Sequence, residues 1–141
     1  MKMLRAVFLA ALFAPAPALA ADSGFLFDLL GQKPYHAAWI ALMKSVQPTP
    51  DWLVQFDKNF DGTSGDVVAA TFEGKDYQMS YVCKPADCVG HRFVVAFETG
   101  ATPHAFGALG GKDNAPAFFG HPPQALQDAM NKALGRAAPA K

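Results

Sequence analysis

Apolar residues recur at helical spacing in three parts of the chain. Between residues 34 and 46 they return every three or four positions, and the prolines that follow prevent continuation, which predicts an amphipathic helix. The same spacing between residues 124 and 134, after two prolines and before Gly135, predicts a helix near the C-terminus. A shorter apolar stripe over residues 25–30 predicts a helix of one or two turns that ends at Gly31.

Between these helices the hydrophobic period changes to that of β-strands. Apolar and polar positions alternate on both sides of the two cysteines, and Glu73-Gly74-Lys75 is typical of a turn. The predicted strands are residues 67–72, 77–83, 92–97, 105–109 and 117–119. The simplest geometry is an antiparallel meander, in which the segment 84–87 joins the second of these strands to the third. Helices at both ends of such a sheet predict the α+β class, with a central antiparallel β-sheet flanked by helices.

The first twenty residues have the pattern of a secretory signal peptide. Basic Lys2 and Arg5 precede an apolar run over residues 6–13, and the small residues 18–20 suit a signal peptidase. Prolines interrupt this run before it could span a membrane, and no later stretch is long enough to do so. We therefore predict a signal peptide over residues 1–20, a single soluble domain over residues 21–141, and a periplasmic location without a membrane anchor.

Charge excludes one class of partner. The chain has twelve basic and twelve acidic residues, and removal of the signal takes away two of the basic ones. The small net negative charge that remains is not the concentrated basic surface that nucleic acid requires. We therefore expect no nucleic-acid partner.

Cys83 and Cys88 are predicted to form a disulfide, because an exported chain meets an oxidising compartment. Four residues lie between them, which is not the two-residue gap of redox pairs, and one pair alone lacks the further ligands of a structural zinc site. So small a ring stabilises the whole fold by only about 2 kcal/mol, so we expect it to shape the loop itself. Lys84, Pro85 and Asp87 would then form a rigid charged tip. From the residues alone, a binding tip and a purely structural staple remain equally open.

Other constellations carry weaker signals. The segment 57–62 matches the first half of a calcium-binding EF-hand loop, but Val68 stands where the bidentate glutamate should be, so a simple turn is the preferred interpretation. The four histidines have no metal-ligand spacing, and no serine lies in a Gly-x-Ser-x-Gly motif. We therefore predict no enzyme, no metal site and no cofactor, and calcium binding remains only a third hypothesis.

The sequence Cys83-Lys84-Pro85-Ala86-Asp87-Cys88 resembles the CKPHDC loop region of the Ivy family, the inhibitors of vertebrate lysozyme. Tyr77-Gln78 before it and Arg92 after it fit the same pattern, and the resemblance extends more loosely from residue 35 to about residue 120. It implies a periplasmic protein whose disulfide-closed loop enters the cleft of lysozyme, where the loop histidine engages the two catalytic carboxylates. The resemblance also implies that the inhibitor can be a homodimer.

The chain departs from this pattern at one position, because Ala86 stands where the family has histidine. A methyl group cannot donate to a carboxylate, and loss of a charge-assisted hydrogen bond costs about 1.5–3 kcal/mol. The leading hypothesis is an inhibitor of c-type lysozyme or a related muramidase that binds through Lys84, Pro85, Ala86 and Asp87. The alternative is a non-inhibitory periplasmic protein-binding module with a different partner. Whether another histidine, His91 or His104, lies near the tip is a question for the structure.

Overall fold

A computed structural model describes residues 24–60 and 62–136. Within these ranges the order of elements follows the predicted alternation of helices and strands. The helices are α1 (Leu26–Leu30), α2 (Lys33–Met43), α3 (Asp51–Asn59) and α4 (Gln124–Ala133). The strands are β1 (Thr63–Ser64), β2 (Val68–Phe72), β3 (Lys75–Lys84), β4 (Asp87–Glu98), β5 (His104–Gly110) and β6 (Ala117–Phe119). The predicted signal peptide lies outside the described residues.

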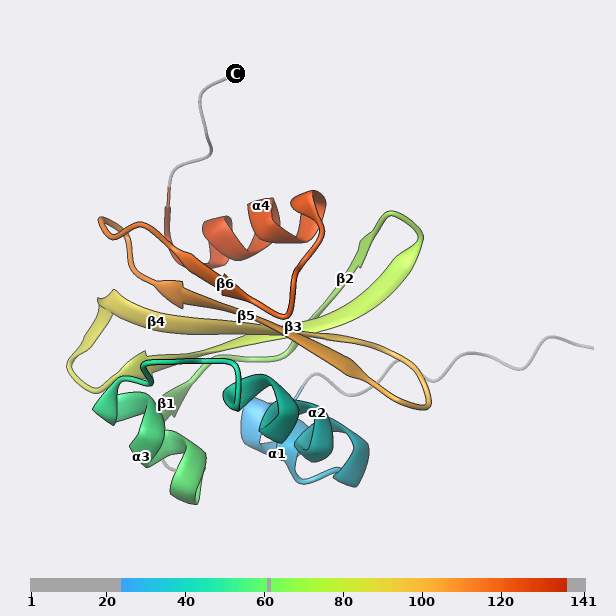
Figure 1. The fold of residues 1–141 in the computed structure, drawn as a ribbon, viewed down its shortest axis with the longest axis horizontal. Coiled ribbons are helices and arrows are strands. Elements are labelled where there is room, and N and C mark those ends of the chain that lie inside the picture. Colours follow the sequence, from blue (N-terminus) through green and yellow to red (C-terminus); the bar gives the residue numbers. More distant parts are fainter. Residues whose placement is uncertain (1–23, 61, 137–141) are drawn as a thin grey trace, which may run out of the picture.

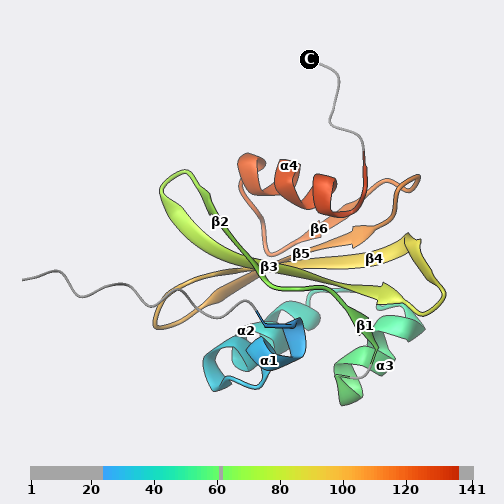
Figure 2. The ribbon, with the colours of Figure 1, turned by 180° about the vertical axis from the view of Figure 1, so that it is seen from behind.

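One antiparallel sheet organises the described chain. Its order is β1-β3-β4-β5-β6, and β2 pairs with the part of β3 that β1 leaves free. Helices α1, α2 and α3 lie on one face of the sheet, and α4 lies on the other, as Figures 1 and 2 show from opposite sides. The predicted α+β class and the meander of β3, β4 and β5 are thus confirmed.

The central strand β4 is buried on both faces, which explains why it reads as a nearly continuous apolar run. Phe93, Val95 and Phe97 pack into the core beneath the first three helices, where Trp39 and Phe56 are almost fully buried. The alternate residues of β4 face α4 and meet a second cluster of buried side chains. That cluster consists of Tyr77, Val94, Ala96, Phe106, Ala108, Leu126, Met130 and Leu134.

Helix α3 is an element that the hydrophobic pattern did not predict. It begins after Pro50 and buries only Leu53 and Phe56, so its apolar stripe is too short to stand out from the sequence. Its last residues belong to the segment that resembles half of a calcium loop. Asp57 lies in this helix, and its Oδ1 accepts a hydrogen bond of 2.6 Å from Trp39 Nε1. This contact ties α3 to α2 and gives the segment a structural role in place of the expected turn.

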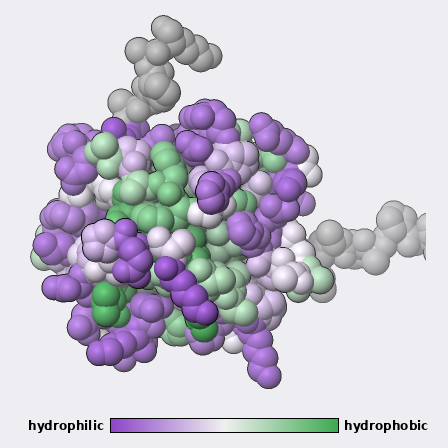
Figure 3. All heavy atoms as spheres, viewed as in Figure 1, coloured by the Kyte–Doolittle hydropathy of each residue, from purple (hydrophilic) through white to green (hydrophobic). Residues whose placement is uncertain are grey.

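The surface of the view in Figure 1 is hydrophilic around its margin, and apolar side chains gather over its middle, around β5 and β6 (Figure 3). Among the described residues, no helix is long and apolar enough to cross a membrane. In the same ranges, no three histidine, cysteine, aspartate or glutamate side chains come together to hold a metal ion.

Leu126→Ala tests whether α4 contributes to stability through its buried stripe. Leu126 is fully buried against the sheet, so its truncation is expected to lower the free energy of unfolding by about 2–5 kcal/mol. Asp128→Ala, on the exposed face of the same helix, should change it by about 0.5 kcal/mol or less. Urea unfolding followed by circular dichroism gives both values, and equal effects would show that α4 is not held by this stripe.

Candidate partner-binding loop

The loop between the two cysteines is the tip of the hairpin formed by β3 and β4. Cys83 pairs with Arg92, and the next pair is Lys84 with Asp87, so the register shifts at this point. Pro85 and Ala86 form the two-residue turn between the members of that last pair. The shift leaves residues 88–91 as extra residues in β4, and they bulge away from the regular ladder.

Ala86 adopts a left-handed backbone conformation, with φ of 64°. An alanine in this region is strained by about 1–2 kcal/mol, whereas asparagine, aspartate and histidine occupy it more readily than other residues with a Cβ. The backbone of the tip is therefore compatible with a histidine at this position. The missing imidazole is a change of side chain and not a change of loop shape.

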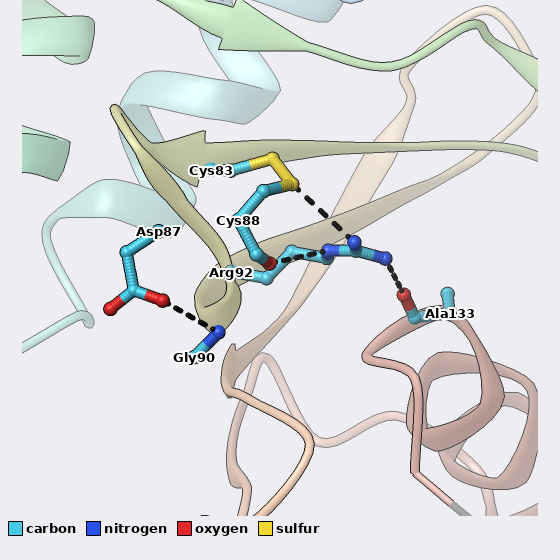
Figure 4. The surroundings of a disulfide bond; sticks show 6 residues. All are labelled: Cys83, Asp87, Cys88, Gly90, Arg92 and Ala133. Carbon is cyan, nitrogen blue, oxygen red and sulfur yellow. Dashed lines mark hydrogen bonds between the residues drawn. A yellow bond between two sulfur atoms is a disulfide. The ribbon is translucent and has the colours of Figure 1, made fainter.

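The predicted disulfide between Cys83 and Cys88 is confirmed, and it closes the loop at the base of the turn (Figure 4). Cys83 is buried at the end of β3, with 1% of its surface exposed, while Lys84 is exposed. The bridge therefore joins the core of the sheet to the bulged start of β4. It restricts the conformation of the loop by linking the two strands of the same hairpin.

Arg92 attaches the same loop to the far helix. Its Nη1 donates a 2.6 Å hydrogen bond to the carbonyl of Ala133, at the C-terminal end of α4. Its Nε donates to the carbonyl of Cys88 at 3.3 Å, and its Nη2 lies 3.4 Å from the sulfur of Cys88 (Figure 4). The guanidinium also lies 4.4 Å from the centroid of the Tyr81 ring. A cation at a helix C-terminus is favourable, so one side chain fixes both the disulfide and the helix end.

Asp87 holds the other side of the loop. Its Oδ1 accepts a hydrogen bond of 3.0 Å from the backbone N–H of Gly90, and its Oδ2 lies 2.7 Å from Nδ1 of His91. These two contacts, the one with His91 first, lower the pKa of the Asp87 carboxyl below its ordinary value. A Cβ at position 90 would lie 2.6 Å from the same carboxylate, so a larger residue there would displace the Asp87 side chain from its present position. The carboxylate thus has a structural task in addition to its place at the tip.

A neighbouring loop supports the bulge from outside the hairpin. The backbone N–H of Lys112 donates to the carbonyl of Val89 at 3.1 Å, and Asn114 Nδ2 donates to the carbonyl of Gly90 at 3.3 Å. Gly111 approaches so closely that a Cβ there would lie 2.0 Å from the Gly90 oxygen. The bulge is therefore packed between its own disulfide and the loop that joins β5 to β6.

The structure separates the two histidines that could lie near the tip. His91 is on the bulge, beside Asp87. His104 pairs with Glu98 at the opposite end of β4, far along the strand from Arg92, and its Nε2 faces the carbonyl of Gly120. Only His91 therefore belongs to the loop. The hydrophobic pattern could not show this, because the four-residue bulge that places His91 beside Asp87 has no signal in the sequence.

A hairpin held rigid from three sides, with charged groups at its tip, would lose little conformational freedom on contact with a partner. The family model described as inhibitor of vertebrate lysozyme (Ivy) matches residues 34–136. The chain belongs to this family, whose members are lysozyme inhibitors and not enzymes. The resemblance that the loop motif suggested is thereby confirmed.

One relative with a matching name and two uncharacterised proteins are similar to this chain. The chain is 30% identical over 146 residues to the inhibitor of vertebrate lysozyme of Pseudomonas aeruginosa, which covers 94% of this chain and 92% of that protein. An uncharacterised protein of the same organism is 33% identical over 73 residues, or 52% of this chain and 44% of that protein. An uncharacterised protein of Yersinia pestis is 31% identical over 81 residues, or 57% of this chain and 50% of that protein.

Arg92→Ala is expected to loosen the loop and the end of α4 together. Removing a charged donor to a backbone carbonyl costs about 1.5–3 kcal/mol, which denaturant unfolding can measure. Hydrogen exchange should accelerate over residues 88–92 and at the last turn of α4. Lys112→Ala, an exposed change on the neighbouring loop, serves as the control. Faster exchange confined to the hairpin would contradict the attachment to α4.

The Asp87 contacts predict a specific titration. NMR titration should give a carboxyl pKa below the ordinary value of 3.8, and His91→Ala should raise it toward that value, because the largest cause of the shift is removed. Because the pKa of Asp87 is lowered in the folded state, its ionised form stabilises the native loop at pH values above its ordinary pKa. This contribution is lost as the pH falls through the folded-state pKa. An unchanged Asp87 pKa in the variant would mean that the His91 contact is absent in solution.

Proposed function

We propose that the mature protein is a periplasmic inhibitor of a c-type lysozyme or a related muramidase, and that it acts by inserting the loop 83–88 into the active-site cleft of the enzyme. The observation that carries this proposal is the rigid disulfide-closed hairpin in a chain of the Ivy family. The Pseudomonas aeruginosa relative, which aligns over nearly the whole chain, is itself named an inhibitor of vertebrate lysozyme.

The rigidity of the loop supports insertion on physical grounds. Binding costs free energy when flexible groups become ordered, and a loop fixed in advance avoids most of that cost. The disulfide, Arg92 and Asp87 each remove freedom from this loop in the free protein. The turn itself stays exposed beyond these attachments, so it can enter a concave partner without rearrangement.

The charges at the tip suit an acidic cleft. Lysozyme-type glycosidases place two carboxyl groups on either side of the bond that they cleave. Among the described residues, the exposed Lys84 ammonium makes no hydrogen bond or ion pair, so it is available to such a cleft. Complementary charge accelerates association and selects partners, even where it adds little affinity.

Two features of the chain support the proposed location. Residues 1–20 have the pattern of a cleaved signal, and a structural disulfide is typical of an oxidising compartment. A periplasmic inhibitor would meet a lysozyme that has crossed the outer membrane before it reaches the cell wall. The homodimer implied by the resemblance stays a prediction, which sedimentation of the mature protein can test.

Titration of the mature protein against a c-type lysozyme tests the proposed function. We expect inhibition by the wild type, stronger inhibition by Ala86→His, and a loss in the Cys83→Ser/Cys88→Ser double variant, because it frees the loop. Gain of the imidazole should improve affinity by about ten- to a hundredfold, equivalent to 1.5–3 kcal/mol.

The outcomes distinguish the candidate functions. If the wild type, Ala86→His and the double cysteine variant all inhibit equally well, insertion of the loop is contradicted, but the inhibitor function is not. If Ala86→His inhibits and the wild type does not, the native target is a muramidase other than the lysozyme tested. If neither protein inhibits, the second candidate function is supported, a protein-binding module with a different partner. The methyl group of Ala86 favours this candidate, because it cannot hydrogen-bond to catalytic acids.

A further inference from the structure

The bulge of β4 carries an exposed imidazole that is oriented by a carboxylate. Nδ1 of His91 lies 2.7 Å from Oδ2 of Asp87, and the two side chains keep 47% and 44% of their surfaces exposed. An ionised carboxylate can only accept a hydrogen bond, so Nδ1 carries the proton and donates. The second ring nitrogen, Nε2, is on the opposite side of the ring from Nδ1 and is therefore directed away from Asp87.

Hydrogen bonds hold the backbone of the bulge that carries His91. The carbonyls of Val89 and Gly90 are bound by the loop between β5 and β6, and Asp87 binds the N–H of Gly90. His91 is followed immediately by Arg92, which is attached to α4. An imidazole on such a frame meets a partner with little loss of freedom.

We propose that Nε2 of His91 is the group through which this loop contacts a carboxyl group in the cleft of its target, with Asp87 as the positioning residue. This inference rests on the proposed function and names the contact that the loop makes. As an imidazolium, His91 donates from Nε2 to an ionised carboxylate; as a neutral ring, it accepts from a protonated carboxylic acid. A lysozyme-type cleft offers one carboxyl group of each kind.

The charge balance of the tip gives a second reason. Asp87 brings a negative charge close to the turn, and a bare carboxylate would be repelled by the acids of a glycosidase cleft. When His91 is protonated, its pairing with Asp87 offsets that charge and leaves Lys84 to set the sign of the tip. Ala86, at the turn itself, contributes no polar atom beyond its backbone.

The test compares two target enzymes. Binding is measured by calorimetry for a c-type lysozyme and for the same lysozyme with its catalytic glutamate replaced by glutamine. His91→Ala should weaken binding to the first enzyme by about ten- to a hundredfold. Against the second it should cost only a few-fold, because the partner carboxyl is already gone. His91→Arg, which keeps a cationic donor, should bind more tightly than His91→Ala.

His104→Ala is the matched control, because it removes an exposed imidazole at the opposite end of the sheet. Disulfide content and thermal unfolding of each variant show whether the loop is intact. If the wild type binds and His91→Ala binds equally well, the His91 contact is refuted while the proposed function survives. An equal loss against both enzymes also refutes it, because a structural role alone would give that result. No binding by the wild type overturns the proposed function, and the inference with it.

Discussion

The geometry of the loop depends on the guanidinium of Arg92. One planar side chain reaches the disulfide, a ring on β3 and the carbonyl of Ala133 at the end of α4, so elements far apart in the sequence meet at a single cation. Hydrogen bonds to a charged donor are stronger than neutral ones, and here one of them satisfies the carbonyl of the last residue of the helix. The disulfide closes the ring, but Arg92 determines where that ring stands on the domain.

Much of the fold could be predicted from the hydrophobic pattern, and the exceptions have physical reasons. The strand β4 is recognisable because both faces are buried, and α4 because its apolar stripe lies between proline and glycine. The hydrophobic pattern did not predict helix α3, because only Leu53 and Phe56 are fully buried in it and most of its other residues are exposed or partly exposed. The tertiary contacts of such a short helix, including the one between Asp57 and Trp39, decide its conformation.

The site was predictable only in part. Compartment and spacing identified the disulfide, and the motif identified the turn between Lys84 and Asp87. Neither revealed the bulge, because a register shift depends on how two strands pair and not on the residues of either one. The register shift places His91 beside Asp87, and the contact of Arg92 with the Ala133 carbonyl joins the hairpin to α4. Both features required three-dimensional coordinates.

The left-handed turn at Ala86 separates the form of the tip from its chemistry. The hydrogen bonds described for the loop come from residues outside position 86, so the backbone there can keep its path with any side chain that accepts the left-handed conformation. The shape of the hairpin and the side chain at its apex are therefore separable features. Under the proposed function, one substitution at the apex would change what the loop presents to an enzyme without changing the domain beneath.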